Sequence, residues 1–422
     1  MNKYMKKIKS YWERWELCCK ENGFKYSVKK AFKRLFKRSS VEAKSVSGNQ
    51  SGNRNDHNKI LIKNLQLPSG LNIAIKIEGG VGDYVIAANY VYKFKQKYHI
   101  PAMNIDLFYV RNFDAIKGIF GENLADRIFL INNGPSEEEL YRKYDLFIRL
   151  SRYPLFVNRN PQKIQMYQPE LLTYLLALEK FKWKYTRFFD DAPFYDGQTA
   201  MVSNIHGVKR FQQGDIDGIL GITEKYEHNI EVSENEEIYL HELGLSEDSY
   251  IIVVASADAR CAGNQNNKVW PDNYWNLLIE KIKVKYPKYK TVLIGSEAIC
   301  DTPINVDLDL SGKTDMESVK ILLKNALLLI SSEGGMVHLR YALTLKKSIV
   351  LFGPTDPDFY GYTHNINLRT DVCKYPCEWF CRDWFKNCSH REYKACMWSL
   401  SPRAVMNAVD EFFKESNINE QV

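Results

Sequence analysis

Two patterns of apolar and polar positions alternate along most of this chain. Short apolar runs predict buried strands, and longer segments with apolar residues at spacings of three and four predict helices. The predicted strands are 71–77, 105–109, 127–131, 145–150, 250–255, 291–295, 326–330 and 348–352. The predicted helices are 84–98, 115–120, 137–144, 171–181, 230–243, one that Thr314 caps and that ends near Asn325, 336–345 and 402–414. Alternating strands and helices indicate an α/β fold with parallel sheets.

The start of the chain has a different pattern. Residues 4–19 and 24–36 each place apolar side chains on one helical stripe, and Lys and Arg flank both stripes. This composition is typical of a helix lying on an anionic membrane surface, although packing against the body or a partner explains an apolar stripe equally well. Residues 39–58 are rich in Ser, Asn and Gly, which predicts a flexible linker.

The domain boundaries follow from these changes of pattern. We expect basic amphipathic helices at 1–38, the linker at 39–58, and Rossmann-like domains at 59–246 and 247–400. A C-terminal helix at 401–416 completes the chain, and in folds of this type such a helix often crosses back to the first domain.

Charge and composition narrow the classes of function. The whole chain carries +7 and residues 1–40 carry +10, so the other 382 residues carry a net −3. A slightly acidic body does not indicate a nucleic-acid partner. No apolar run of about 18 residues is present, so no transmembrane helix is expected, and no apolar signal segment is found. Nine cysteines in so long a chain do not form a small disulfide scaffold. We therefore expect mostly reduced thiols and a cytoplasmic protein.

The segment from Ser331 to Pro357 carries the clearest candidate chemistry. A buried strand is followed by Glu333-Gly334-Gly335 and a helix, and a second strand leads into Phe352-Gly-Pro-Thr-Asp-Pro357. Glycines let the backbone approach a ligand, and the first N–H groups of a helix are unpaired donors. This turn therefore favours an anion such as a diphosphate.

An earlier glycine turn, Glu78-Gly79-Gly80-Val81-Gly82-Asp83, follows the first predicted strand. It lacks the third glycine of the dinucleotide fingerprint, since Val85 stands there. Asp83 at the helix N-terminus would repel a phosphate, so the turn presents a carboxylate into a cleft or uses Asp83 only as a helix cap.

The chain resembles glycosyltransferase family 9, the ADP-heptose:lipopolysaccharide heptosyltransferases and their relatives. The matches are the Gly80-x-Gly82-Asp83 turn, the Lys268-x-Trp-Pro-x-x-x-Trp275 pattern, the Leu310–Asp315 segment, Glu333, Gly334, Gly335, His338, Leu339 and Phe352 to Pro357. At the position of Glu333 the family usually has Asp. The resemblance implies a GT-B architecture, in which two Rossmann-like domains face each other across a cleft.

The implied reaction is inverting transfer of a sugar, expected to be heptose, from a nucleotide diphosphate donor, ADP-heptose first, to a lipopolysaccharide or other surface glycan or glycolipid. Asp83 would be the base. The implied donor-binding residues are Lys268, Ser256, Glu333, Gly334, Gly335, His338, Gly353 and Thr355. The expected acceptor-side residues are Gly80, Gly82 and Arg210, with His206 and Lys209 as further candidates. No catalytic metal is expected. Such an enzyme would work at the cytoplasmic face of the inner membrane, which the N-terminal helices would contact.

Five cysteines, Cys373, Cys377, Cys381, Cys388 and Cys396, crowd together before the last helix. With His390 nearby they could hold a structural zinc or iron. Their spacings are not those of a zinc knuckle, and free or structural thiols explain them as well.

Three other functions fit parts of the pattern. Another GT-B enzyme, such as a nucleotide-sugar epimerase, would bind a donor and need no acceptor. A glycosyltransferase-like binding protein would retain donor binding without transfer. A dinucleotide oxidoreductase is disfavoured by Asp83 and the missing third glycine.

Overall fold

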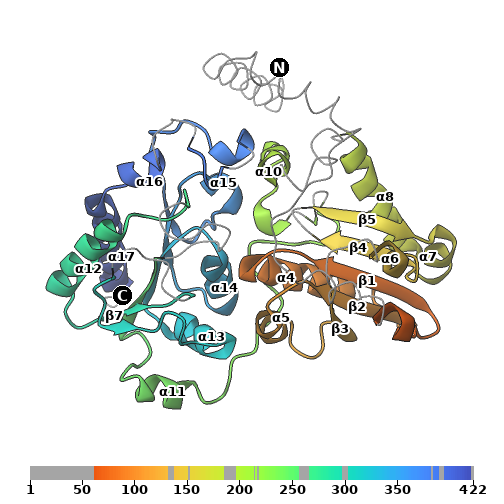
Figure 1. Cartoon of the computed structure of the whole chain (residues 1–422), viewed down its shortest axis with the longest axis horizontal. Coiled ribbons are helices and arrows are strands. Elements are labelled where there is room, and N and C mark those ends of the chain that lie inside the picture. The colour runs from red at the N-terminus through yellow and green to blue at the C-terminus, as the bar shows by residue number, and fades with distance from the viewer. Residues whose placement is uncertain are drawn as a thin grey trace, which may run out of the picture.

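The structure, a computed structural model of the chain, describes residues 61–131, 137–150, 153–184, 196–212, 214–215, 218–255, 266–296, 303–381, 384–388 and 394–419. These residues form two α/β halves that lie side by side, with the N-terminal half at the right of Figure 1. The predicted amphipathic helices at 1–38 and linker at 39–58 lie outside the described residues. Within the described ranges, no helix is long and apolar enough to cross a membrane.

The N-terminal sheet has the strand order β3-β2-β1-β4-β5. Its strands are β1 (Leu71–Ile77), β2 (Met103–Tyr109), β3 (Arg127–Leu130), β4 (Leu146–Leu150) and β5 (Pro154–Arg159). Neighbouring strands are parallel except for β4 and β5, which are antiparallel. The chain moves from β1 to β2 on one side and returns to β4 on the other. Ligands of open sheets bind beyond the carboxyl ends of strands at such a switch point.

The C-terminal sheet has the order β11-β10-β9-β6-β7-β8, and all its strand pairs are parallel. Its strands are β6 (Tyr250–Val254), β7 (Lys290–Leu293), β8 (Leu308–Asp309), β9 (Leu328–Ser332), β10 (Ser348–Leu351) and β11 (Ile366–Leu368). This is the strand order of the doubly wound dinucleotide-binding fold, with its switch point between β6 and β9.

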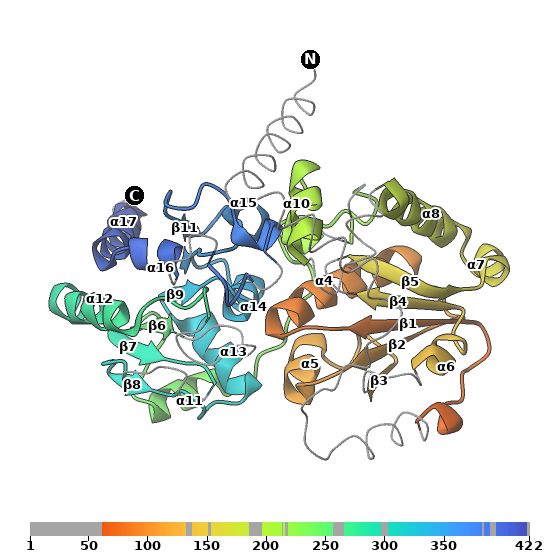
Figure 2. The same cartoon turned by 45° about the horizontal axis from the view of Figure 1, so that its top comes forward.

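Helices cover both faces of each sheet. The N-terminal half contains α4 (Val81–Tyr98), α5 (Phe113–Phe120), α6 (Glu137–Tyr141), α7 (Pro161–Tyr167), α8 (Pro169–Lys184), α10 (Asp196–Ile205) and the 3-10 turn η1 (Arg210–Gln212). The C-terminal half contains α11 (Glu236–Glu242), α12 (Asp272–Lys285), α13 (Met316–Asn325), α14 (Gly335–Leu343), α15 (Pro357–Tyr360), the 3-10 turn η3 (Cys377–Trp379), α16 (Ala395–Ser399) and α17 (Pro402–Asn419). Figure 2 shows α12 and α17 on one side of the C-terminal sheet, and α13 and α14 on the other.

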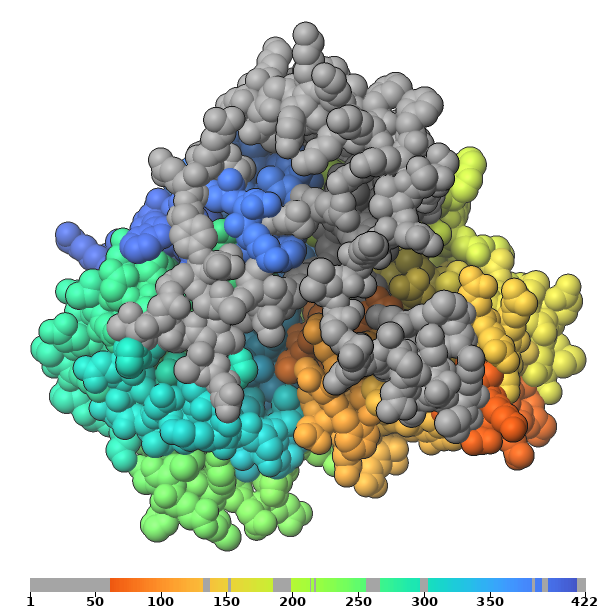
Figure 3. All heavy atoms as spheres, in the orientation of Figure 1, coloured from red at the N-terminus to blue at the C-terminus, as the bar shows by residue number. Residues whose placement is uncertain are grey.

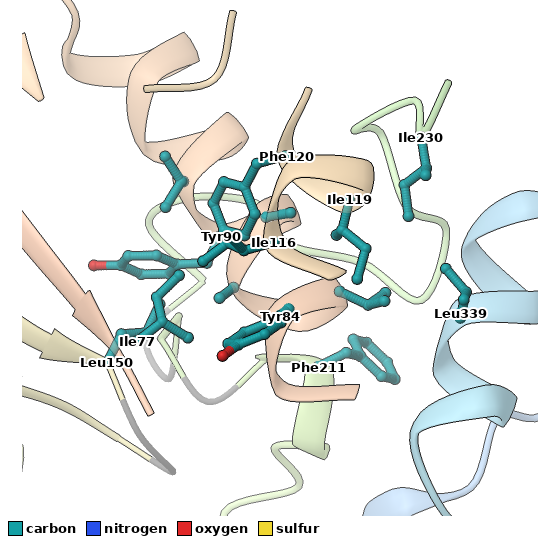
Figure 4. Packing of buried hydrophobic residues seen from close by; sticks show 14 of the residues in the cluster. Ile77, Tyr84, Tyr90, Ile116, Ile119, Phe120, Leu150, Phe211, Ile230 and Leu339 are labelled. Atoms are coloured by element: carbon teal, nitrogen blue, oxygen red, sulfur yellow. The ribbon is translucent and has the colours of Figure 1, made fainter. Parts of the chain in front are cut away.

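One hydrophobic core crosses between the two halves. Tyr84 on α4 and Leu339 on α14 are fully buried members of the same cluster. Phe211, Ile230 and Ile119 of α5 belong to the same cluster, and Figure 4 shows Phe211 beside Tyr84 and Ile230 on the side of Leu339. In the space-filling view the two halves meet along the middle of the molecule (Figure 3). Burial of apolar side chains from both halves therefore stabilises their packing.

Three sequence predictions are wrong in detail. The predicted helix 230–243 is reduced to α11, because its first residues bond to α13 instead. Lys320 donates to the Glu231 carbonyl, and the Ser233 N–H donates to Glu317. The cap of α13 is Asp315, one residue after Thr314, and its carboxylate accepts the Ser318 N–H at 2.8 Å.

The third wrong prediction is that the last helix crosses back to the first half. α17 packs against α12 and β10 of its own half. Tyr286 at the end of α12 donates to Asp410 of α17 at 2.8 Å, and its ring stacks on Phe413 with centroids 4.0 Å apart. Apolar burial on the C-terminal sheet thus fixes where this helix lies.

Candidate active site

The turn after β9 lies at the switch point of the C-terminal sheet. Glu333 and Gly334 join this strand to α14, which begins at Gly335. Gly334 is the N-cap and offers no capping side chain. No side chain caps the first N–H groups of α14, and Gly335 lies against Gly82 of the other half, so this turn stands where the two halves meet and suits an anion.

A buried ion pair lies beside this turn. Lys268 Nζ is 2.5 Å from Glu333 Oε2, and the Thr355 hydroxyl donates to the same oxygen at 3.0 Å. Lys268 also lies over the ring of Trp384, 5.4 Å from its centroid. Burial alone would raise the pKa of Glu333, but the charge of Lys268 and the hydrogen bond from it lower that pKa overall. Glu333 is thus a carboxylate that holds the lysine beside the Gly334-Gly335 turn.

His338 lies on the first turns of α14 and is buried. Burial lowers the pKa of His338 to about 4, against the opposing charge of Glu333. Its Nδ1 is 2.6 Å from the Tyr362 hydroxyl, which is in turn 2.8 Å from the Tyr226 hydroxyl. The imidazole is therefore neutral near pH 7 and acts as a hydrogen-bonding group rather than a cation.

Asp83 occupies the matching turn of the N-terminal half. α4 begins at Val81, three residues before the predicted start, so Asp83 lies within its first turn. Its Oδ2 accepts the Gly80 N–H at 2.8 Å, and its Oδ1 is 2.6 Å from Arg210 Nη2. Gly79 has φ +124°, and a Cβ there would lie 2.0 Å from Asp83 Oδ2. Glycine is required at this position because the carboxylate fills the space.

The two glycine turns touch each other. A Cβ on Gly82 would lie 2.7 Å from His338 Cδ2 and 3.0 Å from Gly335 Cα. A Cβ on Gly335 would lie 2.9 Å from the Gly82 nitrogen. Asp83 of one half is thereby brought next to the Gly334-Gly335 turn of the other, and α4 and α14 lie side by side (Figure 1).

The remaining predicted residues are spread more widely. A Cβ on Gly353 would lie 2.9 Å from the Asn267 carbonyl oxygen and from Met397 Sδ, so this glycine serves packing. Lys209 reaches the Gly361 carbonyl at 3.4 Å, and His206 lies edge-on to Phe181. Ser256 lies outside the described residues.

Several residues of the site were not predicted. Asn204 of α10 donates to Asp356, which joins the two halves. Burial raises the pKa of Asp356 to about 6. Phe211 stacks on Tyr362, with centroids 5.8 Å apart. None of these contacts has a local sequence signal except Asp356, which belongs to the Phe-Gly-Pro-Thr-Asp-Pro motif.

The cysteines form a small thiol cluster. Cys373, Cys377 and Cys396 are buried, and Cys381 and Cys388 are partly exposed. A hydrogen bond with Cys377 lowers the pKa of Cys373, but that with Cys396 and burial raise it to about 12 overall. Among the described residues no group of three or more His, Cys, Asp or Glu side chains is arranged to hold a metal ion. The predicted metal site stays a prediction, because His390 lies outside the described residues.

Two Rossmann-like halves that face each other, as seen here, define the GT-B architecture. Residues 213–379 match the family described as Glycosyltransferase family 9 (heptosyltransferase). The matched segment includes Lys268, Glu333 and the Phe352–Pro357 loop. No protein of curated function matches the chain.

Solved structures are similar over most of the chain. The glycosyl transferase family 9 structure from Veillonella parvula DSM 2008 is 15% identical with a TM-score of 0.50, covering 83% of this chain and 100% of that one. The iron-containing dodecameric glycosyltransferase TibC from enterotoxigenic E. coli H10407 is 12% identical with a TM-score of 0.50, covering 83% and 78%. E. coli ADP-heptose lps heptosyltransferase II is 14% identical with a TM-score of 0.49, covering 82% and 100%. The first two similarities confirm the predicted fold.

Proposed function

We propose that this protein is an inverting glycosyltransferase that moves a heptose from ADP-heptose to a hydroxyl of a lipopolysaccharide or related surface glycan. The observation that carries the proposal is the contact between the Asp83 turn and the Gly334-Gly335 turn. It places a carboxylate from one half beside the donor turn of the other. The family match over 213–379 supports the activity, and TibC, which shares the fold, has been solved in complex with ADP-D-beta-D-heptose.

The donor half would bind and stabilise the leaving diphosphate. The start of α14 supplies unpaired N–H groups and the positive end of a helix dipole. Lys268 supplies a fixed ammonium, held in place by Glu333. Negative charge grows on the diphosphate as the glycosidic bond breaks, and preorganised positive groups stabilise that charge in the transition state. Glu333 would also meet hydroxyls of the donor sugar or ribose.

The acceptor half would supply the base. Asp83 takes the proton of the acceptor hydroxyl as its oxygen attacks the anomeric carbon on the face opposite the diphosphate. One new glycosidic bond forms, the bond to the diphosphate breaks, and the proton ends on the Asp83 carboxylate. This direct displacement inverts the anomeric configuration.

The proposal is tested first by calorimetric binding of ADP-, GDP- and UDP-sugars, ADP-heptose included. We expect selective binding of ADP-heptose and at least a tenfold weaker affinity in Lys268→Ala, of the order of a lost charge-assisted hydrogen bond. The loss is increased because Glu333 would be left as an unpaired buried carboxylate facing the phosphates. Lys281→Ala, which removes an exposed lysine of α12, is the matched control.

The outcomes separate the alternatives. Binding followed by transfer to a glycan acceptor supports the proposal. Conversion of the donor sugar without any acceptor would instead identify a nucleotide-sugar epimerase. Binding without transfer would identify a non-catalytic binding protein, and preference for a UDP- or GDP-sugar would overturn the assigned donor.

Two further proposals concern parts of the chain that these experiments do not reach. We infer from the basic apolar stripes that residues 1–38 contact the cytoplasmic face of the inner membrane. Sedimentation with anionic vesicles should therefore weaken when these residues are deleted.

A structural zinc or iron on the cysteines stays a prediction, and metal analysis of the purified protein tests it. A protein without stoichiometric metal would contradict that prediction.

A further inference from the structure

Both oxygens of the Asp83 carboxylate are engaged by other parts of the N-terminal half. Oδ2 accepts the Gly80 N–H at 2.8 Å, which fixes the carboxylate to its own turn. Oδ1 lies 2.6 Å from Nη2 of Arg210, 127 residues further along the chain. The Arg210 side chain is only 4% exposed, whereas that of Asp83 is 35% exposed. The carboxylate is thus open to an acceptor on one side and held by a buried guanidinium on the other.

The position of Arg210 depends on the C-terminal half. Arg210 is the first residue of η1, and the next residue, Phe211, stacks on the Tyr362 ring with an interplanar angle of 10°. Tyr362 is hydrogen-bonded to His338 of the donor turn. Figure 4 shows Phe211 next to α4, beside Tyr84 and on the side that faces α14. The segment that carries Arg210 is therefore packed between the base and the donor turn.

We propose that Arg210 is a positioning residue, which holds the Asp83 carboxylate in the orientation that accepts the acceptor's proton while the C-terminal half is packed against η1. This inference rests on the proposed function, since it concerns the same base. A guanidinium is suited to the task because its donors lie in a rigid plane. A pair in partly buried surroundings is also screened less by solvent than a surface pair.

The charged and titratable groups around the Asp83 turn come from four segments, one of which is the loop after β2, where Arg111 donates to the Gly79 carbonyl at 3.1 Å. Arg210 of η1 forms the direct ion pair, His338 of α14 faces Asp83 from the other half, and Tyr84 is its neighbour on α4. His338 is neutral near pH 7, and Lys268 is paired with Glu333. Loss of Arg210 therefore removes the guanidinium that contacts the Asp83 carboxylate directly.

The test uses the full chain with Arg210→Ala and Arg210→Lys. We expect the kcat of the alanine variant to fall by about 10²-fold, because misplacing a base by about 1 Å has an effect of that size. Donor affinity, measured by calorimetry, should stay at the wild-type value. The acid limb of its kcat/KM profile should move to higher pH by about one unit, since a neighbouring cation favours the ionised carboxylate. Arg210→Lys should restore part of both effects. Lys225→Ala, which removes an exposed lysine of the same irregular segment, is the control and should match wild type.

A second readout does not depend on turnover. The ¹³C resonance of the Asp83 carboxyl group, assigned by its loss in Asp83→Asn, should titrate at higher pH in Arg210→Ala than in wild type. Wild-type protein that transfers no sugar would overturn the proposed function, and this titration would still measure the ion pair. Unchanged kcat, pH profile and titration in Arg210→Ala would overturn the role of Arg210 alone. An equal loss of donor binding and turnover, not relieved by Arg210→Lys, would also overturn it by showing a purely structural residue.

Discussion

We propose that the C-terminal half binds the donor and the N-terminal half the acceptor, and the two halves hold a charged side chain in place with different parts of the sequence. In each half a functional charge at the switch point of the sheet is held by an opposite charge from another segment. In the donor half Lys268 is held by Glu333, and in the acceptor half Asp83 is held by Arg210. Both members of the donor pair belong to recognisable motifs, but Arg210 comes from an irregular segment without one.

The difference reflects how each half is built. The donor sheet has six parallel strands in the doubly wound order, and both Lys268 and Glu333 follow strands that end at its switch point. The acceptor sheet has five strands and an antiparallel edge, and its base is completed by η1, which is fixed against the other half. The donor site is therefore expected to tolerate separation of the halves better than the acceptor site. Three predictions break or sharpen this comparison.

The largest effect is expected for Asp83→Asn. An amide keeps the shape but cannot take the acceptor proton, so kcat should fall by about 10²- to 10⁴-fold, the usual range for a lost general base. Donor affinity should stay at the wild-type value, because the donor turn belongs to the other half. Steady-state kinetics with calorimetry measures both. Asp114→Asn, which changes an exposed residue of α5, is the control, and full turnover in Asp83→Asn would refute the assigned base.

A smaller effect is expected for Gly82→Ala, which acts on the contact between the halves. The added methyl group would lie 2.7 Å from His338 Cδ2, so the two turns must separate. A misplacement of about 1 Å should lower kcat by about 10²-fold, with a smaller change in donor affinity. Gly80→Ala is the matched control, since a Cβ there meets no atom within 4 Å. Equal kinetics of the two variants would show that close contact of the turns is not needed.

The smallest effect concerns stability. Burial raises the pKa of Asp356 from 3.8 to about 6, so between these values the folded protein binds a proton that the unfolded chain has lost. Stability should therefore fall as pH rises through this window, by about 3 kcal/mol in total. Urea unfolding measures this difference. Between pH 4 and pH 7 the free energy of unfolding of wild type should fall by this amount, and that of Asp356→Asn should not. Asp371→Asn, an exposed neighbour in sequence, should keep the fall. The same slope in wild type and Asp356→Asn would contradict the prediction.

The sequence by itself determined the α/β class, most strands and the two glycine turns. These features depend on local patterns, since buried parallel strands are continuous apolar runs and glycine turns must follow them. The Gly-Gly turn after β9 and the Asp83 turn after β1 could both be located in this way. The predicted helix at 230–243 failed because its first residues bond to α13, a contact that no local pattern reveals.

Only the tertiary structure decided which groups meet. It paired Asp83 with Arg210 across 127 residues, joined His338 to Tyr362 and Tyr226, and set Gly82 against Gly335. It also brought the Cys373 thiol into hydrogen bonds with Cys377 and Cys396. The physical reason is that ion pairs and close approaches depend on distances of a few ångströms between distant segments, and packing of the two halves sets those distances.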